Sequence, residues 1–216
     1  PILGEFPDTD IRDVSSFYLP RGIVMNKDLT KVIPYDQNGV TESVYAAWYD
    51  YDEGPKAALH PYKGETKPHY TGPQPPWQFL QDETKYTWMK APRYNGHPME
   101  VGPLARMLVA YAGGHKDVQA IVGDTLKALN VGPAALFSTL GRTAARGMET
   151  VLLARRLSVW YDDLVTRIKA GDVTTFAGKN WDPSTWPKTA RGYGPLDAPR
   201  GALGHWVEIA DGKISR

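Results

Sequence analysis

A permanently charged arginine stands between a proline and a glycine near the end of the chain, in the segment Ala198-Pro199-Arg200-Gly201-Ala202. Proline fixes its own φ and carries no backbone donor, whereas glycine lets another backbone approach closely. Arginine keeps its charge at any working pH and donates through a planar fork of N–H groups. We interpret Arg200 as a cation aimed at an anionic ligand or a metal-bound group. The alternative is an arginine paired with a carboxylate in a surface turn.

Other residues with chemical potential are more scattered. His205 follows the arginine closely and could shuttle protons, because the pKa of a free histidine lies near neutrality; a hydrogen-bonded structural histidine is the commoner case. The five histidines show no metal-ligand spacing. Glu42 precedes an apolar segment, where a lone glutamate is most often a solvated residue at a strand end.

A strip of alternating basic and aromatic residues runs over residues 85–94. Such strips can bind single-stranded nucleic acid, whose bases stack on aromatic rings. The 25 basic and 24 acidic residues leave a net charge of only +1, and binding to nucleic acid needs a concentrated basic face. We therefore expect no nucleic-acid partner, and a buried lysine in this strip could instead support a metal–water network.

The chain of 216 residues contains no cysteine. This excludes disulfides, thiolate metal ligands and a cysteine nucleophile within it. No run of apolar residues is long enough to span a membrane, and no signal segment opens the chain. The chain begins without methionine and ends soon after a predicted hairpin turn at Asp211-Gly212, so we expect it to be a segment of a longer polypeptide.

The elements that must position these residues indicate an α+β fold. Residues 1–98 are a strand-rich part followed by loops rich in proline, since seven prolines between 61 and 98 prevent long helices. Residues 99–173 form a helical region, and residues 174–216 a loop and a β-hairpin that carries the arginine turn. All three stretches are expected to be parts of one larger domain.

Three helices are predicted in the central region. They cover residues 101–111, residues 116–129, and a long third helix that starts near Pro133 and continues to Ala170. One apolar stripe recurs along the third helix and predicts core packing. Its residues are Met148, Val151, Leu152, Leu157, Trp160, Leu164 and Ile168.

Five separated segments, taken together, resemble the large, catalytic subunit of nickel–iron hydrogenases, and most closely the membrane-associated uptake type. Their order and spacing match over essentially the whole chain. The segments are Thr41–Val44 with Trp48-Tyr49, Leu59–Pro68, Tyr86–Tyr94, Pro98–Ala105, and Ala198–Leu203 with His205-Trp206.

This resemblance implies reversible cleavage of H₂ to protons and electrons. In that family four cysteines, in two Cys-x-x-Cys pairs, hold a nickel and an iron, and the iron carries CO and cyanide ligands. A small subunit with iron–sulfur clusters takes the electrons. The resemblance also allows a membrane cytochrome as a partner and implies a place at the periplasmic face of the inner membrane.

The resemblance transfers four residues. Arg200 matches the arginine over the metal site, and Pro199 matches its neighbour in the same pocket. Glu42 and Lys90 look like the carboxylate and lysine of a magnesium–water network near the active site. No residue of this chain is expected to ligate the nickel–iron centre directly, because both cysteine pairs are missing, so the fragment alone is expected to be inactive and to need the rest of the large subunit.

The sequence also allows two other functions. The respiratory complex I relative of these hydrogenases shares their ancestry, binds a quinone and lacks the metal centre, and a cysteine-free chain would suit it. The third hypothesis is a generic interaction module that binds a partner through the proline-rich residues 61–98.

Overall fold

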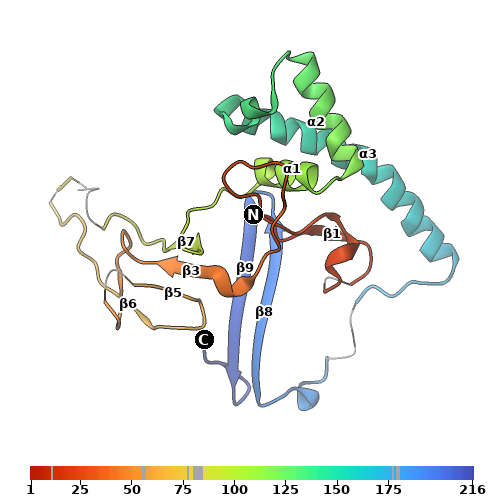
Figure 1. Cartoon of the computed structure of the whole chain (residues 1–216). Coiled ribbons are helices and arrows are strands. Elements are labelled where there is room, and N and C mark those ends of the chain that lie inside the picture. The colour runs from red at the N-terminus through yellow and green to blue at the C-terminus, as the bar shows by residue number, and fades with distance from the viewer. Residues whose placement is uncertain (11, 55–56, 77, 80–84, 177, 179–180) are drawn as a thin grey trace. The chain divides into compact units, whose positions relative to one another are not determined.

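The computed structural model of the chain describes residues 1–216 except 11, 55–56, 77, 80–84, 177 and 179–180. Helices and small sheets both occur, which confirms the predicted α+β class (Figure 1). The chain forms two compact units. One contains residues 1–35 and 100–215, and the other contains residues 36–99 with Arg216. The three sequence stretches named above, as parts of one larger domain, stay a prediction.

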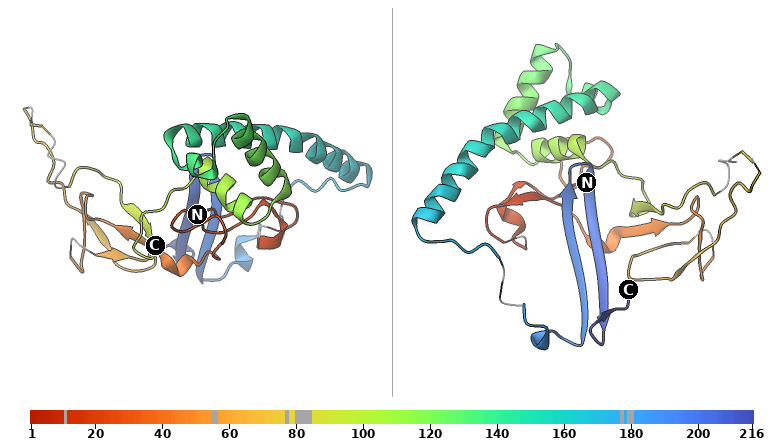
Figure 2. Two further views of the ribbon diagram at one scale, coloured as in Figure 1. Left: turned by 45° about the horizontal axis from the view of Figure 1, so that its top comes forward. Right: turned by 180° about the vertical axis from the view of Figure 1, so that it is seen from behind.

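Three α-helices dominate the first unit: α1 (Pro103–Ala112), α2 (Lys116–Ala128) and α3 (Thr139–Lys169). Their facing sides form one apolar core, because each helix carries apolar residues at helical spacing. The two shorter helices pack against the first half of α3 (Figures 1 and 2). The fully or nearly buried side chains of this core include Leu104, Met107, Leu108, Val118, Ile121, Val122, Leu126, Leu136, Met148 and Leu152.

The third predicted helix begins later than the sequence indicated. Pro133–Phe137 form a separate 3-10 turn, and Ser138 then adopts an extended conformation with φ −105° and ψ 172°. The backbone N–H of Gly141 donates to the Ser138 hydroxyl at 3.0 Å, which is the usual geometry of a helix N-cap. A strong capping serine therefore separates the proline turn from α3.

The predicted burial of the apolar stripe holds for two residues in the first half of α3 and is wrong for Val151 in the same half, which is 42% exposed. Met148 and Leu152 are buried, but Leu157, Leu164 and Ile168 are 61%, 55% and 51% exposed. A helix of 31 residues is about 46 Å long, and its second half extends past α1 and α2 (Figure 1). Core packing was the wrong prediction there, because α1 and α2 do not cover that half of the helix. Leu164 instead lines a pocket beside Phe6 and Pro7 of the N-terminal segment.

Trp160 belongs to that second half and is only partly buried. Its ring lies 4.9 Å from the ring of Phe6, centroid to centroid, and the Arg156 guanidinium lies 5.8 Å from it. The tryptophan therefore covers the N-terminal segment rather than filling the helical core.

A long antiparallel ribbon forms the other large part of the first unit. Strand β8 (Thr189–Ala198) pairs with β9 (Gly201–Ala210) over its full length, from Thr189 opposite Ala210 to Ala198 opposite Gly201. Strand β10 (Lys213–Ile214) adds to β9 after a turn in which Asp211 and Gly212 have positive φ, so the predicted Asp-Gly hairpin is confirmed. The ribbon's arginine-turn end lies beside α1 (Figures 1 and 2).

The N-terminal segment contributes short pieces to the same unit. Strand β1 (Glu5–Pro7) pairs with β2 (Phe17–Leu19) across a 3-10 turn at Val14–Ser16. Further along, Ile23 and Ile33 form a bridge around a turn in which Asn26 and Lys27 have positive φ. Another 3-10 turn, Pro183–Thr185, precedes the ribbon.

The second unit consists of short strands. Strand β3 (Val40–Ser43) lies between β5 (Ala58–Leu59) and β7 (Ala91–Tyr94), while β4 (Tyr49–Tyr51) pairs with β6 (Thr66–Pro68). A 3-10 turn at Gln37–Gly39 precedes β3. In the described part of this unit no α-helix forms, as the prolines predict.

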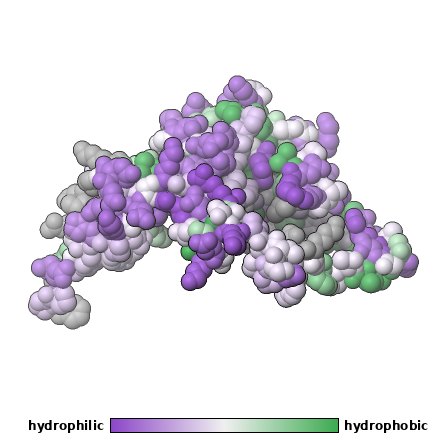
Figure 3. Space-filling view, turned by 90° about the horizontal axis from the view of Figure 1, so that it is seen from below, coloured by the Kyte–Doolittle hydropathy of each residue, from purple (hydrophilic) through white to green (hydrophobic). Residues whose placement is uncertain are grey.

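None of the helices in the described ranges is both long and apolar enough to cross a lipid bilayer. Figure 3 shows apolar residues in separate spots on a largely polar face.

Candidate functional site

Arg200 lies at the tip of a hairpin turn. Strands β8 and β9 are joined only by Pro199 and Arg200, and the pair Ala198 and Gly201 closes the turn. Both Pro199 and Arg200 are exposed. Within the described residues, the Arg200 guanidinium has no hydrogen bond or ion pair, so this turn is not one in which the arginine is already paired with a carboxylate of the chain.

The backbone of the turn packs directly on the entry to α1. A Cβ atom added to Gly102 would lie 2.7 Å from the Arg200 carbonyl oxygen, and one added to Gly201 would overlap the Val101 side chain. Both glycines have positive φ, 95° and 135°. Only glycine combines that conformation with so close an approach.

Buried Arg106 of α1 holds the same turn from behind. Its Nη1 donates to the Ala198 carbonyl at 3.0 Å, and its Nη2 donates to the Pro199 carbonyl at 3.0 Å. Its Nη1 also donates to the Asp197 carboxylate at 3.2 Å, and its Nε and Nη2 both donate to the Glu149 carboxylate. With 2% of its surface exposed, Arg106 fixes the two peptide groups that precede Arg200.

The surroundings of Arg106 are strongly acidic. Glu149, Asp197 and Glu5 all lie near the guanidinium, with the Glu5 carboxylate 3.7 Å away. Burial raises the pKa of Asp197, while the Leu3 N–H that donates to it at 2.5 Å lowers that pKa. Burial raises the pKa of Glu5 to about 7; the Arg106 charge opposes this shift, and the other two carboxylates add to it.

This buried cluster was missed by the sequence interpretation, although a signal exists. Arg106 interrupts an otherwise apolar run, Leu104–Ala110. A charged residue inside such a run is buried with the helix and must be paired. Its partners could not be found in the same way, because Glu149 and Asp197 come from distant segments.

The structure brings Glu42 and Lys90 together in the second unit. Lys90 Nζ lies 2.8 Å from a Glu42 carboxylate oxygen, and both side chains are about one-third exposed, at 28% and 33%. Glu42 lies on β3 and pairs with Pro92 on β7, which places Lys90 just beyond the same ladder. Their role around a magnesium ion stays a prediction.

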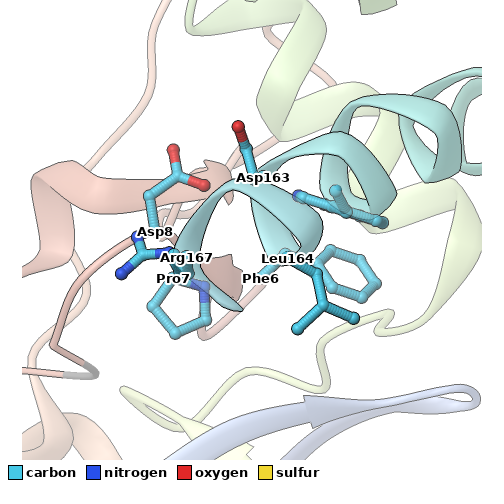
Figure 4. Close-up of a pocket in the computed structure, with 7 residues that line it drawn as sticks. Phe6, Pro7, Asp8, Asp163, Leu164 and Arg167 are labelled. Atoms are coloured by element: carbon cyan, nitrogen blue, oxygen red, sulfur yellow. The ribbon is translucent and has the colours of Figure 1, made fainter. Parts of the chain in front are cut away.

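His205 and a pocket among the described residues of the first unit carry no part of the predicted site. His205 is exposed on β9, opposite Gly194. The pocket, of about 390 Å³, lies between the N-terminal strand and the end of α3 (Figure 4). Its lining mixes Phe6, Trp160 and Leu164 with Asp8, Asp163 and Arg167.

Metal binding by this chain alone is not supported by its donor groups. No cluster of three or more potential ligands occurs among the residues that the structure describes, and the sequence has no cysteine. A guanidinium cannot ligate a cation, but it can donate to an anionic group bound to one. The arginine turn therefore fits the wall of a metal site, not its ligand set.

Residues 2–216 match the family described as nickel-dependent hydrogenase. The chain belongs to this hydrogenase family. It is 45% identical over 208 residues to the uptake hydrogenase large subunit of Bradyrhizobium diazoefficiens, covering 92% of this chain and 35% of that protein. It is 41% identical over 221 residues to the hydrogenase-1 large chain of Escherichia coli K12, covering 98% and 37%.

Solved hydrogenases share the fold. The Ni-Fe-Se hydrogenase of Desulfomicrobium baculatum matches with a TM-score of 0.68 and 30% identity, covering all of this chain and 39% of that one. The Ni-Fe-Se hydrogenase of Desulfovibrio vulgaris Hildenborough matches with a TM-score of 0.68 and 29% identity, covering 100% and 40%. The hydrogenase chain described here thus spans little more than a third of its relatives' length.

Proposed function

We propose that this chain is part of the large, catalytic subunit of a nickel–iron hydrogenase that cleaves H₂ reversibly to protons and electrons. The observation that carries the proposal is the exposed Arg200 on a turn fixed from behind by a buried arginine. Such a turn presents a preorganised cation, and membership of the nickel-dependent family supplies the metal chemistry toward which it points.

The proposed cofactor is a nickel–iron centre whose iron carries CO and cyanide. Cysteine thiolates are the soft ligands that suit such a centre, and they would come from parts of the subunit outside this chain. When bound, the centre supplies the chemistry that splits H₂. Here Arg200 would donate hydrogen bonds to an anionic ligand, and Pro199 would line the same space.

Arg200 would act by electrostatic preorganisation. A cation that is already in place costs no reorganisation when charge separates, and its effect is larger in a site that excludes water. The planar fork also gives direction to the donated hydrogen bonds, which a lysine cannot reproduce. Glu42 and Lys90, 2.8 Å apart, would order the water around a magnesium ion.

The proposed partners are H₂ as substrate, a small subunit with iron–sulfur clusters and a membrane cytochrome. The large subunit would act at the periplasmic face of the inner membrane. Support comes from the uptake hydrogenase large subunits that the chain resembles over nearly its whole length.

The test is the complete subunit's sequence and metal content. We expect two Cys-x-x-Cys pairs outside the 216 residues and bound nickel in the purified protein. A complete subunit without those pairs and without nickel would refute the proposal and would favour the metal-free, quinone-binding relative.

A further inference from the structure

We propose that Arg106 is a positioning residue for Arg200, and that it sets the direction of the exposed guanidinium by fixing the two peptide groups before it. The inference rests on the proposed function for its catalytic meaning, but its structural part concerns contacts within one compact unit.

The hydrogen bonds from Arg106 go to the two carbonyl groups directly before Arg200, and so they restrict the backbone of the turn. Arg106 donates to the carbonyl oxygens of Ala198 and Pro199, both at 3.0 Å. A peptide group is planar, so a fixed carbonyl also fixes the nitrogen on its other side. The Pro199 carbonyl belongs to the peptide whose nitrogen is that of Arg200, and the φ of Pro199 is already set by its ring. Little freedom remains at the Cα atom of Arg200.

Arg106 is itself held in place by hydrogen bonds to two carboxylates. Glu149 accepts from both Nε and Nη2, and Asp197 accepts from Nη1 at 3.2 Å. The five N–H groups in one plane bond five acceptor atoms at once, from α3, β8 and the turn. The compact ammonium of lysine offers only three donors around a point. The geometry therefore requires arginine, not only a positive charge.

Stability alone is a weak reason for this arrangement. Burying one cation with three carboxylates is costly, and buried ion pairs are often no better for stability than apolar packing. The contact between Gly102 and the Arg200 carbonyl already seats the turn on α1. The bonds from Arg106 add orientation to the turn that carries the exposed Arg200.

The first experiment measures amide hydrogen exchange in the complete large subunit and does not depend on activity. In Arg106→Lys we expect the peptide covering residues 196–205 to exchange at least about tenfold faster, while residues 116–128 of α2 are unchanged. The matched control is Arg191→Lys, because Arg191 lies at the other end of the same ribbon, paired with Glu208 at 3.0 Å. It should leave residues 196–205 unchanged.

Unchanged exchange at residues 196–205 would overturn the proposal, and so would an equal increase in α2, which would show general loosening. If Arg106→Lys does not fold, Asp197→Asn replaces it. This change preserves size and an acceptor for Leu3 but weakens the hold on Nη1, and the same peptide should exchange faster.

The second experiment links the turn to H₂ turnover by a double-mutant cycle. If Arg106 acts through Arg200, Arg106→Lys should lower the rate about tenfold in the natural background and less than about twofold in the Arg200→Lys background, with nickel retained in both. Equal losses in both backgrounds would contradict the inference. A subunit with neither nickel nor activity would refute the proposed function instead, and hydrogen exchange would still decide whether Arg106 holds the turn.

Discussion

The partly buried side chain of Glu5 makes the free energy of unfolding depend on pH, with a sign and size that follow from its raised pKa. Its side chain is 14% exposed and lies 3.7 Å from the Arg106 guanidinium. Burial raises its pKa from 4.5 to about 7, against the Arg106 charge. The folded chain thus keeps a proton on Glu5 over a range in which the unfolded chain has already lost it.

The sign and size follow from this difference. As pH rises from about 4.5 to about 7, the unfolded state alone releases the proton, so folding becomes less favourable; above the folded pKa the loss is complete. A shift of this size corresponds to about 3 kcal/mol. Glu5→Gln has the same shape and no titration. We therefore expect it to remove this loss.

The assay is urea denaturation of the protein and of Glu5→Gln over a series of pH values. The difference between the two free energies of unfolding cancels the other titrating groups. It should grow in favour of the variant by about 3 kcal/mol between about pH 4 and about pH 8. A difference that does not change with pH would show that Glu5 has the same pKa in the folded and unfolded chain.

Two further predictions use matched pairs. Leu152→Ala, at a position 3% exposed, should lower the free energy of unfolding by about 2–5 kcal/mol, whereas Leu164→Ala, 55% exposed, should cost less than about 1 kcal/mol in the isolated chain; similar losses in denaturation would show that the core is misplaced. Gly102→Ala should strain the backbone and push on the Arg200 carbonyl, whereas Gly114→Ala, also at positive φ but with open space around it, should only strain the backbone. H₂ turnover should therefore fall in Gly102→Ala alone. Equal rates in the two variants would show that the contact between Gly102 and Arg200 does not matter for turnover.

Local patterns predicted the elements that depend on neighbouring residues. The periodicity of α1 and α2 and the Asp211-Gly212 turn were found because helix and hairpin signals are short-range. Ser138 was overlooked as a capping residue, so α3 was expected to start at Pro133. Strand β8 contains Gly192, Gly194 and Pro195, which read as a loop, and its pairing with β9 supplies the hydrogen bonds that make it a strand.

Only part of the candidate site could be predicted from the sequence. Arg200 could be singled out because proline and glycine flank it. The support behind it could not, since Arg106, Glu149 and Asp197 are brought together from three elements. The exposed second half of α3 shows the same limit, because an apolar stripe indicates that a face is suited to burial but not which element covers it.

The decisive measurement is the H₂ turnover of Arg200→Lys in the assembled enzyme, the complete large subunit with its small subunit, with nickel content measured in the same preparation. Lysine keeps the charge and loses the planar fork, so nickel should be retained and the rate should fall by about 10²–10³. Arg191→Lys, on the same ribbon, should retain both. An Arg200→Lys enzyme with full nickel content and full rate would show that the planar fork of Arg200 takes no part in H₂ cleavage.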